Sequence, residues 1–344
     1  MPDLKQWVIY FFGKHLLKYV MVTPSRHPKE MRVFSIFDLH IILAIGPSFW
    51  AGYLRTLGAF LKRLKLLDTW SSISDIYPRG LIHLYYFLLF TWAKFNNITE
   101  KIIASPMGGI PAELFIRYIC EMDIQIDRVD GAQKLNLSPF FPKRSAKSQE
   151  LIKEFLGILE ELKLTRDAKQ SIIRAFQVYR QSYLTLTQFN ARQPVDVSSV
   201  EATLIDKSKV AGRLWSTWAV ILSLSYFLSE TQVERSESLL YNFGMVTQVF
   251  DDMADVPHDI AECQPNIIYA ICHRYPNELD ALGTHLSGRT GRFLNLEWAK
   301  DNLPLTMSAA KELASQFLDE AIALDSENRI KADMEKCYGA LTKI

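Results

Sequence analysis

The stretch from Asn242 to Ile260 reads N-F-G-M-V-T-Q-V-F-D-D-M-A-D-V-P-H-D-I, and it combines an apolar helical pattern with a row of acids. Asp251, Asp255 and Asp259 lie four residues apart, which places them on one face of the expected helix. Like charges at this spacing repel one another, and a buried carboxylate without a partner is costly. The stretch therefore predicts a core helix whose acids require a cation.

Mg²⁺ is the cation that this pattern favours, because hard divalent ions take oxygen ligands, often one or two carboxylates together with substrate phosphates. Gly244, Gln248 and the adjacent acids Asp251 and Asp252 make the stretch more specific than an isolated D-D-x-x-D sequence. The alternative is a solvated acidic helix face or helix end, which is what most acidic runs are.

A second acidic row closes the helix expected over residues 111–130. Asp123 and Asp127 are four residues apart, Asp130 follows three residues later, and Gly131 is a natural helix stop. Taken alone, this row is typical of an exposed helix end that pairs with nearby arginines. The first row gives it another interpretation, because two acidic rows on separate core helices can face each other across a cavity.

Such a pair of rows could hold several Mg²⁺ ions, and the ions could hold a diphosphate. The metals would act as Lewis acids on the diphosphate as a leaving group, while an apolar tail would occupy the rest of the cavity. Ionisation at an allylic carbon needs a dry pocket that keeps water from the carbocation. The chain has enough aromatic side chains to line such a pocket, with seven Trp, fourteen Tyr and twenty Phe residues.

The whole chain is expected to be all-α and to form one large domain over residues 1–344. Apolar residues make up 49% and charged residues 22% of the chain, which suits a large core, and no linker-like stretch divides it. Apolar periodicity between short Pro, Gly or Asn interruptions predicts helices over residues 4–21, 36–66, 79–95, 111–130, 147–163, 166–189, 199–228, 233–256, 264–274, 276–287 and 304–342, the last with a break.

Charge and cysteine usage exclude several classes of protein. A net charge of +1 argues against an electrostatic nucleic-acid binder. The uncharged apolar runs at 41–54 and 81–93 are too short to span a bilayer, and no signal-peptide pattern is apparent. The four scattered cysteines are typical of free thiols in a reducing compartment, so a cytoplasmic location is expected: Cys120, Cys263, Cys272 and Cys337.

The two acidic rows resemble those of the trans-isoprenyl diphosphate synthase and class I terpene cyclase superfamily. Its second aspartate-rich region, G-x-x-x-Q-x-x-D-D-x-x-D-x-x-x-D, is matched here by Gly244, Gln248, Asp251, Asp252, Asp255 and Asp259. Its first region, D-D-x-x-D, is matched only by Asp123 and Asp127, with Met122 in place of an adjacent acid. A K-T/V-A element that precedes the second region is similar to Lys209-Val210-Ala211.

The resemblance implies a helical bundle of the isoprenoid synthase type, with a central active-site cavity, three Mg²⁺ ions and a possible homodimer. It implies that the metals are bound or oriented by Asp123, Asp127, Asp251, Asp255 and Asp259. It implies that Asp252 assists through water, so that the catalytic set is Asp123, Asp127, Asp251, Asp252 and Asp255. It also implies that Lys209 and Gln248 contact the diphosphate.

Departures from the elongating synthases narrow the expected reaction. Those enzymes carry an Arg-Arg-Gly after the first region, whereas this chain has Arg128-Val129-Asp130, and their early G-K-R element is absent. No lysine follows the second region within Glu262 to Asn266. These losses favour cyclisation of one prenyl diphosphate over joining two. The mixed pattern is similar to atypical fungal humulene-forming cyclases, and also to bacterial large-terpene cyclases with a synthase-like fold.

The leading hypothesis is therefore a Mg²⁺-dependent sesquiterpene cyclase that acts on farnesyl diphosphate. Three alternatives stay open. A prenyl diphosphate elongase would keep the same metal site, a squalene- or phytoene-type enzyme would condense two substrates head to head, and a catalytically silent helical subunit would keep only the fold. The degraded first motif is what a silent subunit would carry.

Overall fold

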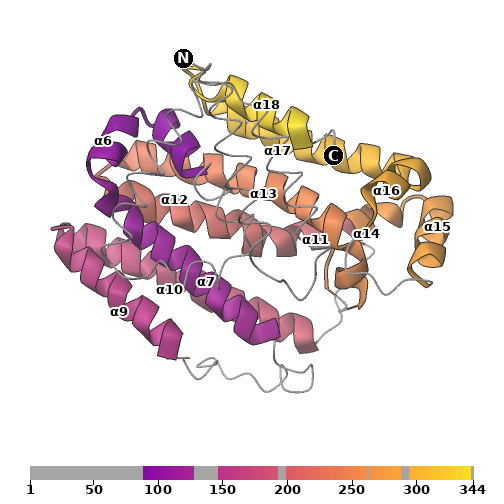
Figure 1. Ribbon diagram of the computed structural model, residues 1–344, viewed down its shortest axis with the longest axis horizontal. Coiled ribbons are helices and arrows are strands. Elements are labelled where there is room, and N and C mark those ends of the chain that lie inside the picture. The colour runs from indigo at the N-terminus through magenta and orange to yellow at the C-terminus, as the bar shows by residue number, and fades with distance from the viewer. Residues whose placement is uncertain (1–87, 128–145, 193–198, 262–263, 288–293, 342–344) are drawn as a thin grey trace, which may run out of the picture.

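The computed structural model describes residues 88–127, 146–192, 199–261, 264–287 and 294–341 (Figure 1). These residues are helical almost throughout and contain no strand, which confirms the all-α prediction for this part of the chain. The helices predicted over residues 4–21 and 36–66 lie outside the described residues, as does the first part of the helix predicted over 79–95.

The observed helices follow the predicted ones closely, with a few additions. In chain order they are residues 88–95, α6 (Thr99–Ala104), the 3₁₀ turn η2 (Pro106–Gly109), α7 (Ile110–Asp127), α9 (Ala146–Glu161), α10 (Arg166–Arg192), α11 (Val200–Lys207), the π-helical turn η3 (Ser208–Gly212), α12 (Arg213–Ser225), α13 (Glu230–Ala261), α14 (Ile267–Cys272), α15 (Pro276–Ser287), α16 (Leu296–Asn302), α17 (Pro304–Ala323) and α18 (Lys331–Leu341). The sequence did not predict α6 or α16, which are each about two turns or less.

The helices pack in layers around α12 and α13. These two helices run antiparallel, joined by a short turn, and make the most extensive contact in the described structure. On one side α13 packs against α17, and on the other α12 packs against α10 and α7, with α9 outside α7 (Figure 1). Because α12 and α13 are covered on both sides, their apolar residues are buried almost all round.

Two glycines allow α12 and α13 to approach each other closely. A Cβ added at Gly244 would lie 2.7 Å from Cδ1 of Trp215 and 3.0 Å from the carbonyl oxygen of Ala211. A Cβ added at Gly212 would lie 2.6 Å from Cε2 of Tyr241. Gly244 of the acidic motif therefore has a packing role: it lets the start of α12, and with it α11, lie against the acidic end of α13.

The helix predicted over residues 199–228 is interrupted by the π-helical turn η3. Ser199 caps its start, because the Oγ atom accepts a hydrogen bond from the backbone N–H of Ala202 at 3.2 Å. A π-helical turn shifts the side chains that follow it by one position around the axis, and such turns are frequent at functional sites. Lys209 lies inside the turn, whereas Lys207 ends the regular helix before it.

Helix α13 continues past Pro257, whereas the sequence predicted its end at residue 256. Proline cannot donate the hydrogen bond that a helix residue normally makes to the carbonyl four residues earlier. The next carbonyl along, that of Ala254, accepts a hydrogen bond from the N–H of Leu294 at 2.8 Å. A residue from outside the helix thus bonds to the turn before Pro257, and Asp259 remains helical.

The two acidic helices start at the same end of the bundle. The Tyr226 hydroxyl, in the turn between α12 and α13, donates a hydrogen bond to the carbonyl of Ser105, just before α7, at 3.0 Å. In Figure 1 both α7 and α13 run away from this turn. At 1.5 Å per residue, Asp123 lies about 20 Å and Asp251 about 30 Å along their helices. Both acidic stretches therefore lie towards the far end of the bundle.

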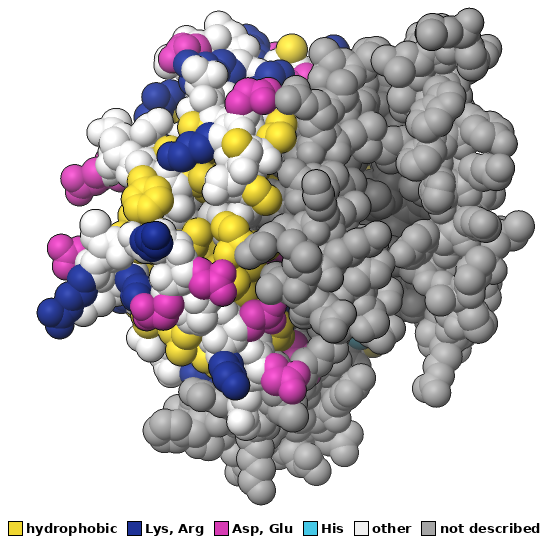
Figure 2. Space-filling view, turned by 60° about the vertical axis from the view of Figure 1, so that its left-hand side comes forward, with side chains coloured by type: hydrophobic (Ala, Val, Ile, Leu, Met, Phe, Trp, Pro, Cys, Tyr) yellow, Lys and Arg dark blue, Asp and Glu magenta, His cyan; other side chains and the backbone are white. Residues whose placement is uncertain are grey.

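On the face in Figure 2, basic and acidic side chains are interspersed among small apolar areas, and no area of one charge stands out. Within the described helices, none is both long enough and apolar enough to cross a membrane.

Candidate functional site

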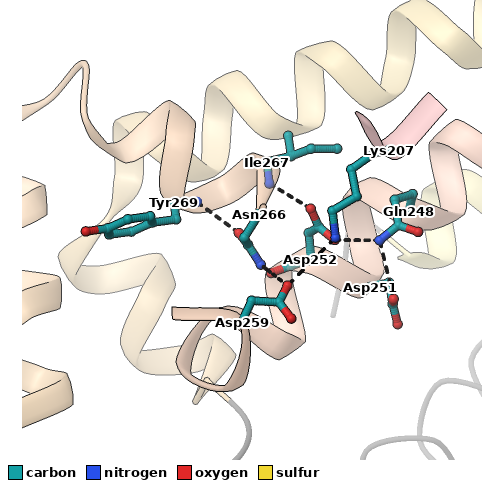
Figure 3. A network of polar contacts seen from close by, with 8 residues as sticks. All are labelled: Lys207, Gln248, Asp251, Asp252, Asp259, Asn266, Ile267 and Tyr269. Carbon is teal, nitrogen blue, oxygen red and sulfur yellow. Dashed lines mark hydrogen bonds and ion pairs between the residues drawn. The ribbon is translucent and has the colours of Figure 1, made fainter. Parts of the chain in front are cut away.

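The acidic end of α13 is built around the buried carboxylate of Asp252 (Figure 3). Its Oδ1 atom accepts a hydrogen bond from Nζ of Lys207 at 2.8 Å and another from Nε2 of Gln248 at 2.5 Å. Its Oδ2 atom accepts a hydrogen bond from the backbone N–H of Ile267 at 2.6 Å. Both oxygens are therefore held by donors from α11, α13 and the start of α14.

Asn266 ties the end of α13 to α14. Its Nδ2 group donates to Oδ2 of Asp259 and to the carbonyl oxygen of Asp252, both at 2.9 Å. Its Oδ1 atom accepts from the backbone N–H of Tyr269 at 2.9 Å and so caps α14. Lys207 is also an ion-pair partner of Asp259, at 3.8 Å. One asparagine and one lysine thus fix two of the four acids.

Asp251 and Asp255 have different surroundings. The Asp251 side chain is exposed, and its Oδ2 atom accepts a long hydrogen bond from Nε2 of Gln248 at 3.5 Å. Asp255, one turn later, is half-buried. Figure 3 shows the Asp251 carboxylate directed away from the network that Lys207 and Asn266 form with the other acids. Asp251 is therefore the acid of this motif that a ligand can reach.

The acids outnumber the cation, and this imbalance changes their pKa values. Burial among protein atoms, and then the charges of Asp255 and Asp252, raise the pKa of Asp251 to about 7. Because this side chain is in contact with solvent, repulsion by its neighbours is the cause that the geometry supports best. Burial also raises the pKa of Asp259, against the opposing effects of Lys207 and Asn266. A positive ion near Asp251 would relieve the repulsion.

Lys207 is a stable cation within this network. Burial alone lowers its pKa, but the charges of Asp252 and Asp259 outweigh that effect, and the pKa lies above its ordinary value. The lysine is therefore charged at neutral pH and balances part of the negative charge. Lys207 is the ion-pair partner of Asp252 and Asp259, and its charge also acts on Asp251, so one lysine offsets only part of the negative charge of these three acids.

The chemistry of these donors fits Mg²⁺ at Asp251 better than at Asp252 or Asp259. Carboxylate oxygens suit a hard divalent ion, but a ligand oxygen must be free to turn towards it. Asp252 has both oxygens engaged, and Asp259 has one engaged by Lys207 and Asn266. No group of three or more His, Cys, Asp or Glu side chains among the described residues is arranged to hold a metal. On α13 the accessible part of the row is Asp251, with Asp255 beside it.

The first acidic row is placed only by its backbone. Asp123 and Asp127 belong to the last turns of α7, but their side chains lie outside the described part of the structure, and Asp130 lies outside it altogether. Their contact with the α13 acids stays a prediction. So does the central cavity, because hollows of about 300 and 740 Å³ in the described part are lined by residues away from the acidic end of α13.

Lys209, predicted to contact diphosphate, lies outside the acidic network. Its side chain is exposed, and Nζ is 3.2 Å from Oδ1 of Asp206 on its own helix. Lys207, two residues earlier, is directed at α13 instead. Residues two apart lie on nearly opposite sides of a helix, so only one of the two lysines can face the acids.

Sequence reasoning missed Lys207 and Asn266. Asn266 had a recognisable signal: it directly precedes the apolar run of α14, where an asparagine is a preferred helix cap. No sequence signal distinguishes Lys207 from Lys209, because which of the two lysines faces α13 depends on the packing of α11 and on the π-helical turn.

Comparisons with models of protein families, with curated proteins and with solved structures found no match.

Proposed function

We propose that this protein is a Mg²⁺-dependent class I terpene cyclase that acts on farnesyl diphosphate. The observation that carries the proposal is that neighbouring acids on α13 have different surroundings. Asp252 and Asp259 are held by Lys207 and Asn266, while the neighbouring Asp251 faces solvent with a raised pKa. A helix that only needed solubility would not require a half-buried lysine to anchor the adjacent acid.

The acids that would hold the metals are Asp251 and Asp255 from α13, together with Asp123 and Asp127 from α7. Bound Mg²⁺ supplies Lewis acidity, which neutralises the diphosphate as it leaves. Asp252 then acts as a positioning residue rather than a ligand, since its two oxygens are engaged by Lys207, Gln248 and Ile267. Gln248 in turn reaches towards Asp251 and links the buried network to the exposed acid.

The reaction consistent with these residues begins with cleavage of the allylic C–O bond, and the electron pair leaves with diphosphate. A double bond of the same chain attacks the cation and closes a ring, and loss of one proton gives a hydrocarbon such as humulene. Cyclisation is favoured over elongation because the chain lacks the Arg pair and the G-K-R element of the elongating synthases. Released diphosphate or a pocket residue would accept the proton.

The test is incubation of the full chain with farnesyl diphosphate and Mg²⁺, followed by gas chromatography and mass spectrometry of the extract. We expect a cyclic hydrocarbon that disappears in Asp251→Ala and survives in the matched control Asp301→Asn, an exposed acid on α16. Parallel assays with C10, C20 and C25 diphosphates test the chain length. Product from one of these alone corrects the substrate, and no product from any of them contradicts the cyclase.

The second candidate is a catalytically silent binding subunit. It is favoured by the internal neutralisation of Asp252 and Asp259 and by the incomplete first motif. Calorimetry of the full chain with Mg²⁺ and inorganic diphosphate separates the two. A cyclase binds Mg²⁺ and diphosphate cooperatively, and Asp251→Ala should abolish the heat of binding, whereas a silent subunit gives no heat of binding.

Adding isopentenyl diphosphate to the product assay tests the elongase, which would release a longer diphosphate.

A further inference from the structure

Lys207 of α11 reaches two acids of α13 at once (Figure 3). Its Nζ atom is 2.8 Å from Oδ1 of Asp252 and 3.8 Å from Oδ2 of Asp259. The ammonium therefore bridges carboxylates that lie about two helical turns apart. The Lys207 side chain is 17% exposed, and those of Asp252 and Asp259 are 1% and 14% exposed. Solvent ions consequently screen this bridge much less than they screen an ion pair on the surface.

A divalent ion between Asp252 and Asp259 would need carboxylate oxygens that already have donors. Oδ1 of Asp252 accepts from Lys207, and its Oδ2 atom accepts from the backbone N–H of Ile267. Oδ2 of Asp259 accepts from Nδ2 of Asn266. An ion at this place would also lie beside the ammonium, and two positive charges at such a distance repel each other. The ammonium and a metal ion therefore exclude each other between these two acids.

The bridge also decides how three helices meet. Lys207 is the last residue of α11 and forms ion pairs with both acids of α13. The start of α14 is bound to the same two acids, through the N–H of Ile267 and the side-chain amide of Asn266. A cation that fixes the two carboxylates therefore also fixes where α14 begins.

From these contacts we propose that the ammonium of Lys207 takes the place of a divalent ion between Asp252 and Asp259, so that α11, α13 and α14 are joined before any metal binds. Asp259, which the acidic row predicts as a metal ligand, is then not a ligand. Mg²⁺ is left with the outer part of the row, at Asp251 and Asp255. This consequence for the metal site rests on the proposed function, whereas the role of Lys207 in joining the helices does not.

The first experiment uses the unaltered full chain. Amide hydrogen exchange of the peptide 264–275 is followed by mass spectrometry, once with a metal chelator and once with Mg²⁺. This peptide contains the N–H of Ile267, bonded to Asp252, and the N–H of Tyr269, bonded to Asn266. We expect equal protection in both conditions, because the ammonium is always present. Fast exchange in the chelator, whether or not Mg²⁺ slows it, overturns the proposal.

The second experiment removes the ammonium. Lys207→Met keeps most of the aliphatic chain, and with the chelator the peptide should lose protection about tenfold or more, because breaking the pair leaves an uncompensated buried charge. Mg²⁺ should restore that protection by entering the vacated place. The matched control Lys209→Met, which removes an exposed lysine of the adjoining turn, should behave as wild type. Protection that Mg²⁺ does not restore contradicts the exchange of ammonium for metal. The wild-type measurement decides the proposal if Lys207→Met does not fold.

The third experiment measures the consequence for the metal site, by calorimetry of the full chain with Mg²⁺ and inorganic diphosphate. Asp259→Asn should bind with wild-type affinity, whereas Asp251→Asn should bind about tenfold more weakly or less, because it removes a charged ligand. An equal loss in the two variants would make Asp259 a ligand and overturn the proposal. If wild type itself gives no heat of binding, the proposed cyclase fails, and the exchange measurements still decide the role of Lys207.

Discussion

Asp252 on α13 and Glu113 on α7 are both buried carboxyl groups, yet the fold accommodates them in different ways. Asp252 is 1% exposed and has three donors around its two oxygens, including the charged Lys207. Glu113 is 4% exposed, and its Oε2 atom has no hydrogen-bond partner among the residues that the structure describes. Both oxygens of the first acid accept hydrogen bonds, whereas one oxygen of the second accepts none from the described residues.

The pKa of Glu113 reflects this difference. Burial raises it to about 7; the charge of Arg117, one turn later, opposes the shift, and that of Glu154 on α9 adds to it. A protonated carboxyl group is therefore the form that suits the contact between α7 and α9. The comparison teaches that burial alone does not distinguish the two acids: donors from three helices engage both oxygens of Asp252, whereas Oε2 of Glu113 has no donor among the described residues.

The largest expected effect comes from removing the cation of the network. Lys207→Met should destabilise the protein by about 3 to 5 kcal/mol, because it leaves Asp252 buried without its charged partner. The measurement is the free energy of unfolding from urea titration. The double variant Lys207→Met/Asp252→Asn removes both charges and should recover part of the loss. A loss below about 1 kcal/mol for the single variant would show that the buried ion pair is not what holds this end of α13.

The second prediction concerns pH and Glu113. Its pKa is higher in the folded protein than in the unfolded chain, so the folded state binds the proton more tightly. The resulting stability is fully present below pH 4.5 and is lost as the pH rises through about 7, a change of about 3 kcal/mol. Other acids titrate in the same range, so the measured quantity is the difference in unfolding free energy between wild type and Glu113→Gln. A difference that does not vary with pH would contradict the raised pKa.

The third prediction separates the two functions of Asn266. Asn266→Ala removes the cap of α14 and the bonds to α13, and we expect a loss of about 1 to 2 kcal/mol. Asn266→Ser keeps an oxygen that can cap α14 but not the bonds to α13, so it should recover only the part of the stability that the cap contributes. If the network also positions the catalytic acids, both variants should lower the yield of hydrocarbon from farnesyl diphosphate. Equal activity in both variants and wild type would restrict Asn266 to a structural role.

The sequence predicted most helices because apolar periodicity reports which face of a helix is buried, and that pattern is local. It also predicted that the acids of α13 share a face. It did not predict that Asp252, between the members of the row, is the buried one, because that depends on where α11 and α14 pack. The π-helical turn and the extension of α13 beyond Pro257 likewise depend on tertiary contacts, such as the bond from Leu294 to Ala254.

The smallest expected effect on stability comes from the lysine that the sequence motif singled out. Lys209 is exposed and paired with Asp206 on its own helix, and an exposed pair of this kind contributes less than about 0.5 kcal/mol. Lys209→Gln should therefore unfold at nearly the same urea concentration as wild type, in contrast to Lys207→Met. Its effect on turnover is then informative: because the fold is unchanged, a raised KM for farnesyl diphosphate with an unaltered kcat would mean that the exposed ammonium contacts the diphosphate. If KM and kcat both match wild type, the diphosphate contact does not belong to Lys209, and Lys207 is the lysine of α11 and η3 that matters to the site.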